Sequence, residues 1–196
     1  MSDRLYLSCW TRGFSAFTML QHYGKLLDTF PFSKLSQRPQ TLRVHAVSHS
    51  EPPVVEKPFE PNVGPAEILD AARDFTGGDC SVDIESAWDL WQFDGDWKLA
   101  PAPVTISCFG PDFEKDFIDQ SGGDNLRIDF GLDSKFLPLP GVQGALRMQQ
   151  SNIRSLLYLV TQLEQALPLS RRQLWSESGA NFAEILAKAV QGFSAN

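Results

Sequence analysis

Residues 81–100 read SVDIESAWDLWQFDGDWKLA, a run of β-prone residues interrupted once by Asp94-Gly95. An Asp-Gly pair between two such runs is typical of a tight β-hairpin turn. With a two-residue turn, Gln92 faces Trp97 across the hairpin. The stretch therefore predicts two antiparallel strands and makes a β-sheet part of the fold.

Strand and helix patterns continue on both sides of this hairpin. Alternating apolar residues predict strands, and apolar residues three and four positions apart predict helices. The expected strands cover residues 4–10, 41–47, 81–93, 96–100, 104–109 and 125–131. The expected helices follow Ser15, begin at Pro65, and cover residues 153–167 and 182–193. Residues 50–64 hold four prolines and predict an extended connector outside the core.

These elements predict an α+β fold, with a mixed or antiparallel sheet of about six to seven strands and four helices mainly on one side. Two pairs of similar segments suggest an internal duplication. LSCWTRGF at 7–14 resembles ISCFGPDF at 106–113, and TLRVHA at 41–46 resembles NLRIDF at 125–130. We therefore expect a single compact domain over residues 1–196, with ferredoxin-like pseudo-repeats at 1–100 and 101–196.

The charge of the chain is unevenly distributed. The 196 residues carry 17 Lys and Arg against 24 Asp and Glu, a net charge of −7. Residues 51–140 hold 19 acidic and six basic side chains, whereas the rest of the chain is net positive. An acidic belt repels phosphate backbones and attracts basic proteins. Such a belt also keeps a protein soluble without any specific role, so the sequence allows a basic protein partner and argues against nucleic acid.

Three features predict a cytoplasmic protein without a membrane segment. The longest apolar run, residues 156–160, is much shorter than the roughly 18 residues that a membrane helix needs. Arg12 falls where a signal peptide would need an apolar core. The cysteines, Cys9, Cys80 and Cys108, are odd in number and form no CxxC pair, so no disulfide framework is expected.

The motifs of common catalytic and cofactor sites do not occur in the sequence. His45 and His49 are four residues apart, but on a strand end their side chains would stand roughly 13 Å apart, too far to share a metal ion. Cys9 lies on the same strand face as Leu5 and Leu7, which predicts a packed thiol rather than a nucleophile. No glycine motif for phosphate binding is present. We expect no cofactor and no metal, and favour a non-enzymatic protein.

The hairpin is the strongest candidate for a binding site. Its side chains Trp88, Trp91, Phe93, Asp94 and Trp97 fall within ten residues. Strand alternation places Trp88 on one face and Trp91 with Phe93 on the other. Two interpretations stay open: both faces are covered, as in a central strand, or one aromatic face with an acidic rim binds a partner.

Three hypotheses about function follow. The first is an acidic protein-interaction module, such as a regulator or an immunity-type inhibitor of a basic protein, that binds through the hairpin. The second is a carboxylate-dependent hydrolase or sugar-acting enzyme that uses residues such as Asp79 and Asp112. The third is a small-ligand sensor with a pocket between the two halves. The sequence indicates no oligomeric state.

Overall fold

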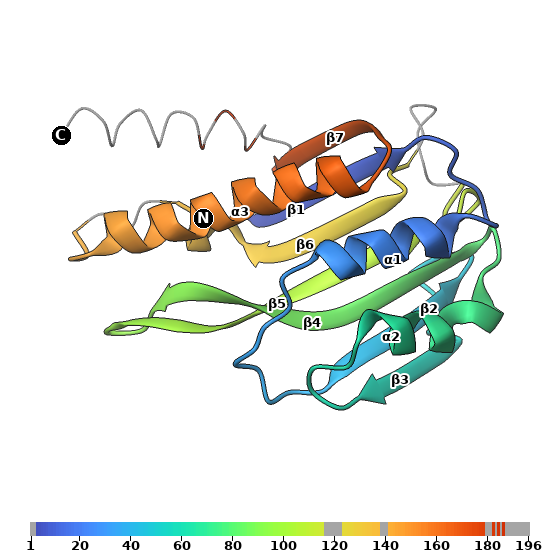
Figure 1. Ribbon diagram of the computed structural model, residues 1–196, viewed down its shortest axis with the longest axis horizontal. Helices are drawn as coiled ribbons and strands as arrows, with labels where there is room; N and C mark the ends of the chain where they lie inside the picture. The colour runs from blue at the N-terminus through green and yellow to red at the C-terminus, as the bar shows by residue number, and fades with distance from the viewer. Residues whose placement is uncertain are drawn as a thin grey trace.

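A computed structural model describes residues 3–115, 123–137, 141–178 and the single positions 182, 184 and 186. It contains a seven-stranded sheet in the order β3-β2-β4-β5-β6-β1-β7 (Figure 1). The strands are β1 (Arg4–Thr11), β2 (Gln40–Ala46), β3 (Val55–Phe59), β4 (Cys80–Phe93), β5 (Trp97–Phe109), β6 (Leu126–Leu132) and β7 (Leu169–Ser176). Every pair of neighbours is antiparallel, which confirms the expected α+β class.

Three α-helices cover one face of the sheet (Figure 1): α1 (Met19–Thr29), α2 (Pro65–Ala72) and α3 (Ala145–Ala166). Pro65 is the first residue of α2, as expected, because the first helical turn leaves its N–H groups unpaired in any case. The expected count of four helices is wrong for the described residues, which hold three, and residues 182–193 lie mostly outside them. No helix in the described part of the chain is long and apolar enough to cross a membrane.

The hydrophobic core lies between the helices and the covered face of the sheet. Alternate residues of the strands point into it, among them Leu5, Leu7 and Cys9 of β1. Tyr23 of α1 is fully buried there, and its hydroxyl donates a 2.7 Å hydrogen bond to the carbonyl of Ile106. Each fully buried aliphatic side chain stabilises the fold by about 1.5–3 kcal/mol. Cys9 lies in this core, so the packed position predicted for it is confirmed.

Two strands, β3 and β7, were not expected. β3 lies in the proline-rich segment that we expected to be a connector, and it forms an edge of the sheet, where a proline such as Pro58 is tolerated. β7 forms the other edge, and the alternation of its sequence is obscured by Arg171 and Arg172. It contributes Leu174 to the core, opposite Leu7 of β1.

The β4–β5 hairpin extends beyond the rest of the sheet as a two-stranded arm (Figure 1). We call residues 89–101 the arm. Phe93 pairs with Trp97, so the expected pairing of Gln92 with Trp97 is wrong by one position. The turn has three residues rather than two, with Gly95 in its middle at a φ of +74°.

β5 runs without a break through Pro101 and Pro103, which we expected to end a strand. β6 pairs with β5 only between Thr105 and Cys108. The two prolines therefore fall where β5 has a single neighbour, and their missing N–H groups interrupt no second ladder.

The internal duplication is not confirmed. The segments that resemble each other differ in their pairing, because β5 and β6 are neighbours whereas β4, β5 and β6 separate β1 from β2. Residue 101, the expected boundary between the halves, lies inside β5. The two pseudo-repeats remain a prediction.

Candidate functional site

The predicted binding residues divide between the core and the arm. Trp88 is 4% exposed and packs against the rings of Phe30, Phe130 and Phe136, with ring centroids 5.7–6.5 Å apart. It belongs to the hydrophobic core and is not open to a partner in this structure. For Trp88, the interpretation in which the face of the strand is covered therefore applies. The interpretation in which an aromatic face is exposed is left for the other side of the arm.

The other side of the arm carries four apolar side chains. Trp91 pairs with Leu99, and Phe93 pairs with Trp97. Cross-strand partners share a face of a sheet, so all four lie together. Phe93 and Leu99 are 41% and 45% exposed, and the Phe93 and Trp97 ring centroids are 5.4 Å apart. Asp94 is exposed in the turn beside this face.

Leu99 is a member of this face that the sequence analysis missed. The expected register paired it with Leu90, which is buried at 1% exposure. A shift of one residue in a strand moves each side chain to the opposite face. The three-residue turn makes this shift and brings Leu99 to the open side.

The arm is held in place by α3. The side chain of Asn152 bonds both backbone groups of Trp91: its Nδ2 donates to the carbonyl oxygen and its Oδ1 accepts from the N–H, each at 2.9 Å. The indole N–H of Trp97 donates to the carbonyl of Gln143 at 3.0 Å. These bonds position the arm relative to the helix layer.

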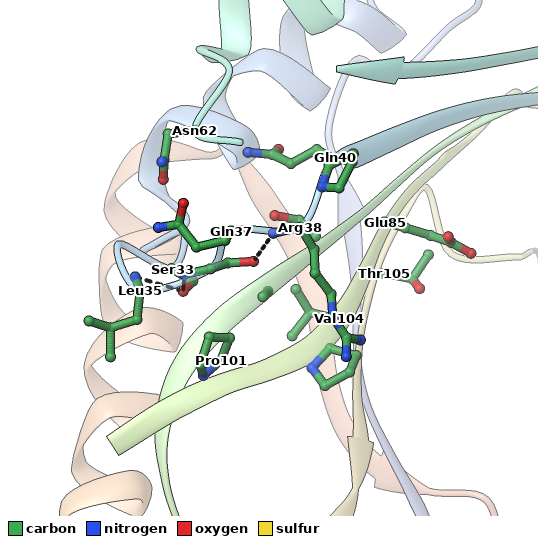
Figure 2. Close-up of a pocket in the computed structure, with 15 residues that line it drawn as sticks. Ser33, Leu35, Gln37, Arg38, Gln40, Asn62, Glu85, Pro101, Val104 and Thr105 are labelled. Atoms are coloured by element: carbon green, nitrogen blue, oxygen red, sulfur yellow. Dashed lines mark hydrogen bonds between the residues drawn. The ribbon is translucent and has the colours of Figure 1, made fainter. Parts of the chain in front are cut away.

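A cavity of about 860 Å³ lies at the root of the arm, between the segment 33–40 and strands β4 and β5. Figure 2 shows the Arg38 side chain extending from this segment toward Val104. Pro101 and Pro103 also line the cavity, and their cross-strand partners are Asp89 and Ala87.

The lining residues Pro101 and Pro103 lie on the same side of the ribbon as Leu99, because strand residues two positions apart share a face. The Oε1 atom of Gln40, another lining residue, is buried without a hydrogen-bond partner among the described residues. The arm face and the root cavity thus lie on the same side of the ribbon.

The face of the sheet opposite the helices, which we call the open face, carries a second group of charged, polar and aromatic side chains. His49 lies at the junction of two cavities there, of about 500 and 230 Å³. Its Nε2 is 3.3 Å from a carboxylate oxygen of Asp83, and its Nδ1 is 3.3 Å from one of Glu114. The hydrogen bond to Asp83, and the charges of both carboxylates, raise the pKa of His49 against the opposing effect of burial. Both ring nitrogens of His49 therefore face carboxylate oxygens.

His45 and His49 are much closer than expected, with ring centroids 5.0 Å apart. The expected separation of roughly 13 Å assumed a continuous strand. β2 ends at Ala46, and Val47 adopts a φ of +68°, which turns the chain back. Within the described residues, no group of three or more His, Cys, Asp or Glu side chains is arranged to hold a metal ion.

Arg127 is fixed on the open face by a chain of hydrogen bonds. Its Nε and Nη2 atoms donate to the two oxygens of Asp124 at 2.8 and 2.6 Å. Asp124 also accepts from the hydroxyl of Ser8, whose oxygen accepts from the indole N–H of Trp175 at 3.0 Å. The Asp124 side chain is only 5% exposed, so Arg127 is held by a buried carboxylate.

Two aromatic rings lie beside the same guanidinium. The Arg127 Cζ atom is 4.9 Å from the ring centre of Phe109 and 5.9 Å from that of Trp175. Trp175 in turn stacks on Tyr6 at 4.5 Å. These residues come from β1, β5, β6 and β7, which are far apart in sequence, so no local pattern could have indicated the cluster.

The carboxylates considered for an enzyme lie near one loop. The backbone N–H of Asp112 donates to the carbonyl of Gly78 at 2.7 Å, one residue before Asp79. The Asp112 carboxylate pairs with Lys115 at 2.9 Å. Neither Asp79 nor Asp112 lines any of the three cavities described above. Those cavities therefore offer no substrate site beside these two carboxylates.

Comparison of the chain with models of protein families, with curated proteins and with solved structures finds no match. The functional argument therefore depends on the geometry of the two surfaces, the arm with its root cavity and the open face around Arg127.

Proposed function

We propose that this chain is a non-enzymatic, acidic protein-interaction module that binds a basic protein through the arm. The observation that carries the proposal is the shared face of Trp91, Phe93, Trp97 and Leu99 on a ribbon that extends beyond the sheet. Large apolar side chains gathered on an exposed surface are typical of protein interfaces, and tryptophan is enriched among residues that dominate binding energy.

The charge around the arm favours a basic partner. Asp94 and Asp96 are exposed at the turn, and Lys98 is the only basic residue between positions 89 and 101. Charge complementarity accelerates association and selects against partners of like charge. A regulator and an immunity-type inhibitor both act by this kind of non-covalent binding.

The root cavity supplies a place for an anchoring side chain of the partner. Its volume of about 860 Å³ exceeds that of any single side chain, and its lining residues Pro101 and Pro103 lie on the same side of the ribbon as the apolar face of the arm. Buried anchors surrounded by water-excluding contacts are typical of tight interfaces.

The test compares three forms of the full chain as bait in a lysate of the source cells. The arm variant carries Phe93→Ser and Leu99→Ser. The control variant carries Leu157→Ser and Tyr158→Ser on α3, where two apolar side chains are also exposed, at 49% and 66%.

We expect a basic protein to bind wild type and control alike, and the arm variant at least tenfold more weakly by titration, since tenfold corresponds to about 1.4 kcal/mol. The binding to wild type should also weaken as salt is raised. Equal affinity of the arm variant and wild type for every captured protein contradicts the proposal.

A further inference from the structure

We propose that the open-face cavity of about 500 Å³, which we call the arginine groove, binds a small organic oxyanion, a molecule with a carboxylate or phosphate group on an apolar or aromatic body. Its volume lies within the range of about 300–1,000 Å³ that is typical of small-molecule sites. The groove is built from β1, β5, β6, β7 and nearby loops, and none of its lining residues belongs to the arm. The inference is therefore independent of the proposed protein interface.

Arg171 is the first group that points to an anion. Its guanidinium lies over the ring of Trp10, with Cζ 4.3 Å from the ring centre, and its Nη2 donates to Gln173 at 2.7 Å. Among the described residues, Arg171 makes no ion pair with a carboxylate. A guanidinium has five N–H donors, so most of those of Arg171 remain for a ligand.

Arg127 is the second such group, and the protein holds it in advance of binding. Asp124 occupies two of its five donors, and the ring centres of Phe109 and Trp175 lie 4.9 and 5.9 Å from its Cζ atom. A guanidinium matches a carboxylate or phosphate with two parallel hydrogen bonds. Because a ligand need not order Arg127, less free energy is lost on binding.

The two acidic side chains of the groove, Asp124 and Glu114, each accept hydrogen bonds from the protein. The Asp124 side chain is 5% exposed and accepts hydrogen bonds from Arg127 and Ser8. One oxygen of Glu114 accepts from both the backbone and the ring of His49. Within the described residues, the contacts of Glu114 use one of its two oxygens, and its side chain is 31% exposed, so the donors that remain on Arg127 and Arg171 lie near one partly exposed carboxylate.

The walls of the groove indicate an organic anion rather than a bare ion. The aromatic side chains of Phe14, Phe109 and Phe113 line it together with the two arginines. Apolar walls with a few placed polar groups are typical of small-molecule sites, in which the polar groups orient the ligand. A ligand with a ring and one acidic group would use both kinds of contact.

The experiment titrates the full chain with AMP, benzoate and neutral adenosine, and follows binding by calorimetry. We expect AMP, benzoate or both to bind wild type, and adenosine to bind at least tenfold more weakly than AMP wherever AMP binds. Comparison of AMP with benzoate shows whether the phosphate or the carboxylate is preferred. Arg171→Gln should weaken the binding of the preferred anion at least tenfold, because the unpaired donors are lost.

Arg154→Gln is the matched control, since Arg154 is an exposed arginine on α3, outside the groove. It should leave the affinity unchanged. Arg127→Lys keeps the charge beside Asp124 but loses the paired geometry, so it should also weaken anion binding. The arm variant should bind the anion as wild type does, which separates this site from the protein interface.

Three results would overturn the inference. The first is the failure of both AMP and benzoate to bind folded wild type at millimolar concentration. The second is equal binding of AMP and adenosine, which would assign the affinity to the ring alone. The third is an unchanged affinity in Arg171→Gln when circular dichroism shows that the variant is folded.

Discussion

His49 lies beside two residues with unusual backbone angles on the open face. Val47 and Glu114 both have positive φ, +68° and +53°, and the N–H of Glu114 donates to the carbonyl of Val47 at 2.9 Å. Such positions cost on the order of 1–3 kcal/mol each in a residue other than glycine, and they persist where surrounding contacts fix them. The bonds from His49 to Asp83 and Glu114 are contacts of this kind.

The stabilising effect of His49 should depend on pH. Its pKa is raised in the folded protein above the value of about 6.5 in the unfolded chain. Its contribution is therefore fully present below pH of about 6.5, and it is lost as pH rises through the folded pKa. We expect His49→Gln to lower the free energy of unfolding more at pH 5.5 than at pH 8, by less than about 1 kcal/mol, because the side chain is 40% exposed.

Urea unfolding of wild type and variant at both pH values measures this difference. A His22 substitution should show the opposite dependence of stability on pH, because burial lowers the pKa of His22. A group with a lowered pKa loses its contribution as pH falls. His22→Gln should therefore be more destabilising at pH 8 than at pH 5.5. A His49→Gln effect that is equal at both pH values would show that the two carboxylates do not stabilise a charged imidazole.

Single residues differ in how far the sequence predicts them. The burial of Cys9 follows from its alternation with Leu5 and Leu7, which is a local pattern. The proximity of His45 and His49 does not follow, because valine disfavours a positive φ and no local feature announces one at Val47. The histidine cluster therefore depends on tertiary contacts.

At the scale of elements, Asn152 should control the attachment of the arm. It is 1% exposed, and its amide bonds the backbone of Trp91 and the carbonyl of Lys135. Asn152→Ala leaves these backbone groups without their partner, and an unsatisfied buried group costs about 1–3 kcal/mol. We expect the free energy of unfolding to fall by about this amount in urea titrations.

Hydrogen exchange tests whether the loss lies at the arm. The Trp91 amide should exchange faster in Asn152→Ala than in wild type. Ser155→Ala is the matched control, since Ser155 is an exposed residue of α3 whose hydroxyl bonds, within the described part of the chain, the carbonyl of Ser151 alone. Unchanged exchange at Trp91 would mean that Asn152 does not hold the arm.

Elements were predictable where one face of a strand or helix is continuously apolar. β1, β2, β4 and β6 have such faces, and their expected limits differ from the observed ones by at most one residue at each end. β3 and β7 are edge strands with few buried residues, so their alternation is weak. The register of the arm depended on the turn length, which an Asp-Gly pair alone does not determine.

At the scale of the whole molecule, the strand order connects the two predicted halves. β1 lies in residues 1–100, yet its neighbours β6 and β7 lie in residues 101–196. The local pattern of each strand carries no information about a partner more than a hundred residues away. The sequence therefore predicted the class of the fold but not this order, and the arginine groove, which needs β1 beside β6 and β7, was not predictable.

The strand order predicts that the halves unfold together, and two cysteines can report this. Cys9 of β1 and Cys108 of β5 are 2% and 0% exposed, and burial raises the pKa of the Cys9 thiol to about 12. Neither thiol should react with a thiol reagent until its strand opens. With Cys80 changed to Ser, both should become reactive at one urea concentration, equal to the unfolding midpoint by circular dichroism.

The experiment uses two single-cysteine variants, which retain either Cys9 or Cys108. Removing β1 from the sheet would leave β6 without one neighbour and β7 without its only neighbour among the described strands, so opening the first half exposes the second. Coincident midpoints would therefore follow from the interleaved strands and would make residues 1–196 one cooperative unit. Two separate midpoints would contradict this expectation and would instead support the pseudo-repeats at 1–100 and 101–196 as independently folding units.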